Sequence, residues 1–194
     1  EHDVGRTPNL GYEPAGTYGF VRFLEHGFPN PLVRWHYHEE YELHLIVATR
    51  GKVFVGDYIG QFEPGHLVLT GPRLPHNWIS TEVPEGGVAL RDMVLQFADA
   101  PLRQAAAQIP ELAEALPLLE RARYGIEFFG LSERMRERIT RVKQLHGLQR
   151  FAEFTELLGE LAGSNDYRLL STVQLQSFDD DAALARLSGI VDFL

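Results

Sequence analysis

The chain has 194 residues, of which 44% are hydrophobic, and a formal net charge of −9 from 27 acidic and 18 basic side chains. This size and composition allow one sizeable domain, or one domain with a helical extension, and exclude a disordered chain. The acidic balance argues against a duplex-DNA-binding surface, which needs clustered Lys and Arg. With no cysteine, the chain has no disulfide, thiolate zinc site or cysteine nucleophile.

No apolar run approaches the roughly 18 residues that span a bilayer, and no signal-peptide pattern opens the chain. We therefore expect a cytoplasmic protein with no membrane partner.

Residues 1–17 contain Gly, Pro and Asn with little pattern and are expected to form an extended arm. The next eighty residues alternate short β-prone runs, such as "YELHLIVAT", "KVFVGDYI" and "VALRDMVLQF", with turn sequences such as "EPG" and "TGPRLP". Many short antiparallel strands in so few residues predict a small barrel or jelly roll.

Residues 99–178 are predicted to be mainly helical, with Pro101 and Pro110 near helix starts and Gly125 as a stop. Two amphipathic helices, at about 132–147 and 151–163, are expected to form an antiparallel hairpin. Its apolar stripes serve either to pack on the barrel or to form a dimer seam. Residues 179–194 predict the start of a further helix with no stop signal.

The stretch "WHYHEEYELHLI" places His36, His38 and Glu42 where they can chelate one ion. Two histidines at i and i+2 of a strand point the same way, and a carboxylate four residues on can join them across a small bend. That bend is expected to turn Glu40 towards solvent. His76, on the turn "TGPRLPHNW", is the expected fourth ligand. Three imidazoles and a carboxylate suit Zn, Ni, Fe, Mn or Cu. The same groups could instead serve as hydrogen-bonding partners of an organic ligand.

Three further residues are candidate ligand contacts. His44 lies one strand step beyond Glu42, either as an effector contact or as a hydrogen-bonded core histidine. Trp78 shares parity with His76 and is expected at the pocket mouth, where it would stack on a ring or sugar face. Arg22, on the first strand, is either a carboxylate anchor or a surface residue.

Two other histidines, His26 and His66, lie in predicted turns and are expected to be solvated. No sequence context for nucleotide binding or for a Ser-His-Asp triad is visible, and no catalytic residue is assigned.

The sequences "HYHEEYE", with Gly51, and "EPGHLVLTGPRLPH" resemble the two consecutive motifs of the cupin barrel. The resemblance implies an α+β chain with a cupin β-barrel (jelly roll) over residues 18–98. It also implies that His36, His38, Glu42 and His76 are metal ligands. The gap between Glu42 and Gly51 is two residues longer than the usual cupin spacing.

The arm, the cupin motifs, the strand "MVLQF" and the following helices resemble the sensing half of AraC-type transcriptional regulators. This resemblance implies that a small-molecule effector binds in the barrel and that the helical segment mediates homodimerisation. It further implies that residues 179–194 lead to a DNA-binding domain absent from this chain, through which alone DNA is bound.

The first alternative to a sensing domain is a stand-alone metal-dependent cupin enzyme, a dioxygenase or isomerase, using the same four residues. A second is a metal-independent sugar-binding or storage-type barrel.

Overall fold

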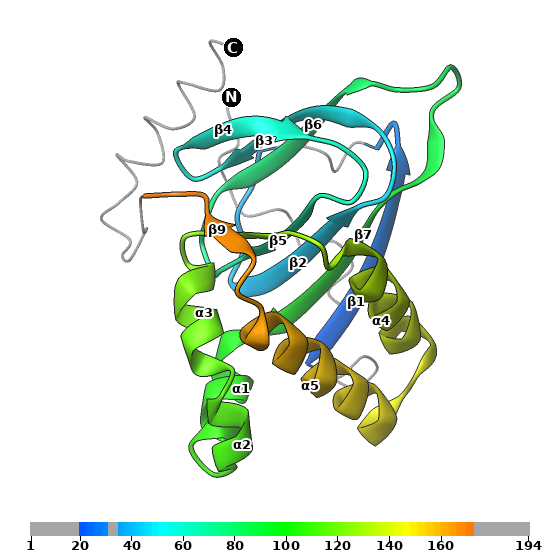
Figure 1. The fold of residues 1–194 in the computed structure, drawn as a ribbon. Helices are drawn as coiled ribbons and strands as arrows, with labels where there is room; N and C mark the ends of the chain where they lie inside the picture. The colour runs from blue at the N-terminus through cyan, green and yellow to red at the C-terminus, as the bar shows by residue number, and fades with distance from the viewer. Residues whose placement is uncertain (1–19, 31–34, 173–194) are drawn as a thin grey trace.

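In the computed structural model, which describes residues 20–30 and 35–172, antiparallel strands form two sheets and helices cover one of them (Figure 1). The strands are β1 (Val21–Phe28), β2 (Glu40–Ile46), β3 (Arg50–Val55), β4 (Tyr58–Phe62), β5 (Leu67–Thr70), β6 (His76–Glu82), β7 (Val88–Ala98), β8 (Ile126–Phe128) and β9 (Tyr167–Leu169). The helices are α1 (Asp99–Ala106), α2 (Pro110–Ala113), α3 (Leu116–Ala122), α4 (Ser132–Gln144) and α5 (Gly147–Gly163). The predicted arm and the predicted helix at 179–194 lie outside the described residues.

The two sheets are stacked as layers. The larger sheet has the strand order β1-β7-β2-β5-β8-β9, and the smaller has the order β4-β3-β6. Figure 1 shows the smaller sheet over one face of the larger sheet, with α4 and α5 on the opposite side. The predicted α+β class and antiparallel strands are confirmed, but the closed jelly-roll barrel is not. The described strands form two separate sheets, and an isolated bridge between His36 and His76 links them at one end.

Strand β2 is buried on both faces. Because successive side chains of a strand point to opposite faces, its odd-numbered and even-numbered residues have different surroundings. Its odd-numbered residues belong to the apolar cluster shared with the helices: Tyr41, Leu43 and Leu45. Its even-numbered residues point into the space between the sheets, where the His44 ring lies 4.0 Å from the ring of Trp78 on β6. The polar row of β2 therefore faces the interior of the sandwich.

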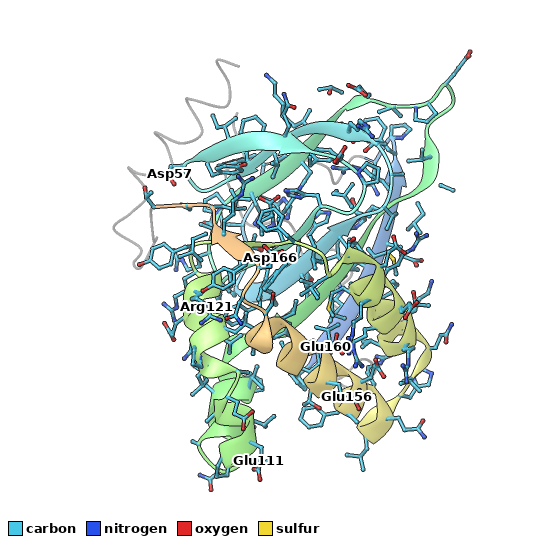
Figure 2. The ribbon with its side chains drawn as sticks, in the orientation of Figure 1. Asp57, Glu111, Arg121, Glu156, Glu160 and Asp166 are labelled. Carbon is cyan, nitrogen blue, oxygen red and sulfur yellow. The ribbon has the colours of Figure 1, made fainter. Side chains whose placement is uncertain are left out.

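The predicted helical hairpin is confirmed as α4 and α5. Their apolar stripes are buried in the cluster under the larger sheet: Met135, Ile139, Val142, Phe154, Leu158 and Leu161. Arg138 of α4 ties the two helices together through hydrogen bonds of 2.6–2.8 Å to Glu153, Glu156 and Glu160, the last two of which are labelled in Figure 2. None of the described helices combines the length and hydrophobicity that a membrane-spanning helix needs.

The segment predicted to be mainly helical also contributes two strands to the larger sheet. After α3, Gly125 adopts φ +68°, which ends the helix and leads directly into β8. β8 pairs with β5, and β9 pairs with β8 at the sheet edge. Residues after Ala98 therefore complete the sheet as well as cover it.

Candidate metal centre

Three histidines and one glutamate form a compact cluster at one end of the space between the sheets. The ligand atoms of His36, His38, Glu42 and His76 all lie within 4.8 Å of one another. The first two residues precede β2, Glu42 lies within it, and His76 opens β6. The structure thus brings together the four residues that the sequence spacing predicts to converge, while their occupation by an ion stays a prediction.

Backbone hydrogen bonds hold the segment before β2 against the start of β6. The N–H of His36 donates to the carbonyl oxygen of His76 at 3.3 Å, and the N–H of His76 donates back at 2.9 Å. A bend at Glu39 then separates His38 from β2. The Glu40 side chain is 45% exposed, as expected, and is not one of the four clustered residues.

The tautomers of two imidazoles leave their Nε2 atoms available to a cation. Nδ1 of His76 donates to the Leu74 carbonyl oxygen at 2.8 Å, and Nδ1 of His38 donates to the Glu40 carbonyl oxygen at 3.0 Å. A neutral ring bonded in this way carries a lone pair on Nε2, the arrangement of metal-binding histidines with backbone partners. Nε2 of His76 is buried and has no hydrogen-bond partner in the described structure. An uncompensated buried polar atom costs about 1–3 kcal/mol, and a bound ion would remove that cost.

The Glu42 carboxylate is oriented from three sides. Nε2 of His38 lies 3.0 Å from its Oε2, Gln96 donates to Oε2 at 2.9 Å, and Nδ1 of His44 lies 3.2 Å from Oε1. Burial by itself raises the pKa of Glu42, but hydrogen bonds from His38 and His44 and the charge of His76 outweigh burial and hold it well below its usual range. The group is therefore the carboxylate that a metal requires.

The half-buried His38 and the buried His76 differ in their proton affinity. Burial lowers the pKa of His76 well below its usual value, and the charge of His36 lowers it further. Burial also acts to lower the pKa of His38, but the hydrogen bond and charge of Glu42 outweigh this and raise it. In the metal-free protein the Glu42 carboxylate is therefore paired with the readily protonated imidazole of His38. A bound cation would replace that proton.

A second layer of charge lies behind the cluster. His26 Nδ1 lies 2.7 Å from Asp92 Oδ1, and His44 Nε2 lies 3.4 Å from Asp92 Oδ2. Burial opposes ionisation of both groups, yet their mutual attraction raises the pKa of His44 to about 9 and lowers that of Asp92. The expectation that His26 is a solvated turn residue is wrong, because it lies in β1 opposite Asp92. Strand register, which the sequence does not reveal, brings Asp92 and Gln96 to the site.

The three residues predicted to contact an effector lie at different depths. His44 and Trp78 are buried, with the Trp78 residue only 2% exposed. Arg22 lies in β1 opposite Gln96 of β7, and β7 separates it from Glu42 in β2. Their contact with a ligand stays a prediction.

His66 is a further buried histidine, and the expectation that it is solvated is wrong. Its side chain is 4% exposed, and its Nδ1 accepts a hydrogen bond of 3.3 Å from Nε1–H of Trp78. Trp78 thus separates His66 from His44, whose ring it contacts.

Neither the family models nor the curated proteins match this sequence. Among solved structures, an oxalate decarboxylase matches with a TM-score of 0.28 and 18% identity over 77% of this chain and 32% of its own. ToxT from Vibrio cholerae matches with a TM-score of 0.38 and 11% identity over 89% of this chain and 64% of its own. Streptomyces albus HEPD, with 2-hydroxyethylphosphonate and Fe(II) bound, matches with a TM-score of 0.32 and 20% identity over 89% and 39%.

These structures include cupins and an AraC-family regulator. The chain spans less than two thirds of the length of each of them. At such low TM-scores we draw no conclusion about activity from them.

Proposed function

We propose that this chain is a metal-binding cupin-type domain that senses a small molecule on behalf of a transcription regulator. The observation that carries the metal assignment is the convergence of four ligand atoms within 4.8 Å, contributed by His36, His38, Glu42 and His76. One divalent transition-metal ion, Zn, Ni, Fe or Mn, would occupy the cluster.

The chemistry of the donor set supports this assignment. Three imidazoles and one carboxylate bind a divalent ion in their deprotonated forms, and the charge balance of the cluster keeps Glu42 ionised. A bound ion would supply Lewis-acid coordination of an oxygen-containing ligand. The chain's own residues orient the carboxylate through Gln96 and exclude water by packing Trp78 over His44.

The regulatory part of the proposal is supported by the sequence resemblance and the layered architecture. A sheet sandwich that also carries a helical hairpin offers a route from a ligand-bound interior to a partner surface. In this proposal the domain forms a homodimer through its helical segment, and a DNA-binding domain outside this chain contacts the operator. Analytical ultracentrifugation of this domain tests the dimer, and a monomer at all concentrations would contradict it.

Elemental analysis of protein purified without nickel resin or chelator tests the metal assignment. We expect about one divalent ion per chain in the wild type, and Glu42→Gln should lose most of it. His146→Gln, on an exposed residue at the start of α5, is the matched control and should keep the ion. A wild-type protein that binds no ion on titration with Zn, Mn, Fe or Ni would overturn the assignment.

A metal-dependent cupin enzyme is the second candidate, and the number of protein ligands favours it. Four protein donors leave coordination positions open on an ion that prefers five or six ligands. Turnover distinguishes the candidates: the enzyme would consume oxygen or isomerise substrate with the isolated domain, whereas a sensor binds its ligand without converting it.

A further inference from the structure

A second polar cavity lies at the other end of the sandwich from the metal cluster. It has a volume of about 720 Å³ and is lined by the start of β3, the turn between β4 and β5, the end of β6, and β8 with its following loop. Register separates the two sites: His76 pairs with Val55 at the end of β3, whereas the cavity is lined by the start of β3, where Arg50 pairs with Glu82. The volume is in the range of small-molecule sites and far above that of a single water.

His66 lies in the wall of this cavity, with its Nε2 atom buried. Its Nδ1 accepts from Trp78, so in the neutral ring the proton resides on Nε2. Burial, reinforced by the positive charges of His44 and Arg168, lowers the pKa of His66 to about 4, which keeps the ring neutral near pH 7. Nε2 is buried and has no hydrogen-bond partner among the residues described. A donor in this condition requires an acceptor from a ligand or from water.

Glu127 supplies an acceptor beside this donor. Its Oε1 lies 3.6 Å from Nε2 of His66, just too far for a direct hydrogen bond. Its other oxygen accepts from Nε of Arg168 at 2.7 Å, which holds the carboxylate in place and compensates its charge. A single hydroxyl oxygen can accept from His66 and donate to Glu127, since 3.6 Å is shorter than two hydrogen bonds of about 2.8 Å each.

The charges and rings around the cavity favour a neutral ligand. Arg50 is paired with Glu63 at 3.0 Å, and the lining also holds one lysine, Lys52, and one further glutamate, Glu82. Because acidic and basic groups cancel, a net anion or cation gains little. Phe129 is 39% exposed and lines the same cavity, offering a ring face to the C–H groups of a ligand.

We propose that this cavity binds a neutral polyhydroxylated small molecule, one hydroxyl of which bridges His66 and Glu127. The site is separate from the metal cluster and requires no ion, so it extends beyond the proposed function and does not depend on it.

Saturation-transfer NMR with the metal-free and metal-loaded protein tests the assignment. The probes are glucose, xylose, ribitol and inositol, with urea as the amide probe and acetate as the anion probe. We expect at least one of the neutral polyols to bind, with the same affinity in the presence and absence of chelator. Glu127→Gln and His66→Phe should each weaken binding about tenfold or more, because each leaves one buried partner unsatisfied.

Glu111→Gln is the matched control for the carboxylate change. Glu111 lies on the short helix α2, at the far lower end of the molecule in Figure 2, and is exposed. It should bind the polyol as the wild type does. Phe129→Ala changes only the exposed rim and keeps the test usable if the His66 variant fails to fold, since it too should weaken binding.

Four results would overturn the inference: no binding of any polyol, equal binding by wild type and Glu127→Gln, preference for urea or acetate, or loss of polyol binding on chelation. The last result would place the ligand at the metal cluster instead. A wild-type protein that binds no divalent ion on titration but still binds polyols would leave this inference standing while the proposed metal function fails.

Discussion

Nε2 of His38 lies 3.0 Å from Oε2 of Glu42, while Nδ1 of the same ring is hydrogen-bonded to the Glu40 carbonyl oxygen at 3.0 Å. The ring therefore cannot turn its Nε2 away without breaking the backbone contact. A proton or a cation has to lie between nitrogen and carboxylate, because two lone pairs would otherwise face each other.

Adding a divalent metal should stabilise the wild-type domain against heat. Binding to the folded state alone contributes about 4 kcal/mol at a free metal concentration of about 1,000 times Kd. For a domain of this size that corresponds to a rise in Tm of about 10 °C. Differential scanning fluorimetry of chelated and metal-loaded protein measures the rise. Glu42→Gln, which keeps the size of the side chain, should show little of it. An equal rise in both proteins would mean that the metal binds elsewhere.

Replacing Gln96 by Leu should weaken metal binding without removing the site. Gln96 lies directly opposite Glu42 in the β2–β7 pair and donates to its Oε2 at 2.9 Å. Loss of such a partner of a metal ligand typically costs about 10- to 100-fold in affinity. Competition titration with a metal-indicator dye measures the change, and stoichiometry at saturation should stay the same. Gln104→Leu, on the exposed face of α1, should bind as the wild type does. Unchanged affinity in the Gln96 variant would exclude a positioning role.

Replacing Gly51 by Ala should destabilise the fold. A Cβ at position 51 would lie 1.9 Å from the carbonyl oxygen of Ile79, on the neighbouring strand β6, and the backbone has to move to accommodate it. We expect a loss of about 1–3 kcal/mol in the free energy of unfolding. Gly159→Ala is the matched control: it lies in α5, has nothing within 4 Å, and should gain about 0.5–1 kcal/mol. Urea denaturation measures both, and the opposite signs make the pair decisive.

Acid should destabilise the domain partly through His66. Its folded-state pKa of about 4 lies below the usual value of 6.5, so the unfolded chain binds the proton more readily between these values. Stability is therefore complete above about pH 6.5 and falls as the pH decreases towards 4. Between pH 7 and pH 5 this group contributes a loss of about 2 kcal/mol. The charged groups facing His66 are His44, Glu127 and Arg168.

Urea denaturation at pH 7 and pH 5 measures this contribution. His66→Gln should lose about 2 kcal/mol less than the wild type between the two pH values. His146→Gln, at an exposed position, should retain the wild-type dependence. Parallel pH profiles for wild type and His66→Gln would refute the assignment of the acid sensitivity to His66.

Local pattern was enough to predict the candidate metal ligands. The i, i+2 spacing of His36 and His38, just before β2, and a bend ahead of Glu42 predicted that the three side chains share one side, and a Gly/Pro turn supplied His76. The same pattern indicated that Glu40 points to solvent. The i, i+2 spacing is a local property of the backbone and requires no knowledge of the partner strand, whereas ligation of an ion by these residues stays a prediction. The two helices of the hairpin were predictable for the same reason, since their periodicity extends over several turns.

The structure around those ligands was not predictable from local pattern. His26 and His66 looked like solvated turn residues, yet one faces Asp92 across β1 and β7, and the other is covered by Trp78. β8 and β9 have three residues each, too few for any periodicity to identify them as strands. β8 joins the larger sheet by pairing with β5, which is distant in sequence, and β9 joins it by pairing with β8.

The sequence by itself determined an α+β chain with antiparallel strands, a helical hairpin and a set of histidines and one carboxylate able to converge. Only the tertiary structure decided that the strands form two sheets instead of a closed barrel. It also decided which second-layer groups orient Glu42 and that an opposite cavity pairs His66 with Glu127. The physical reason is that alternation and helical periodicity are encoded between near neighbours. Strand register, burial and the approach of two sheets depend on contacts between residues far apart in the chain.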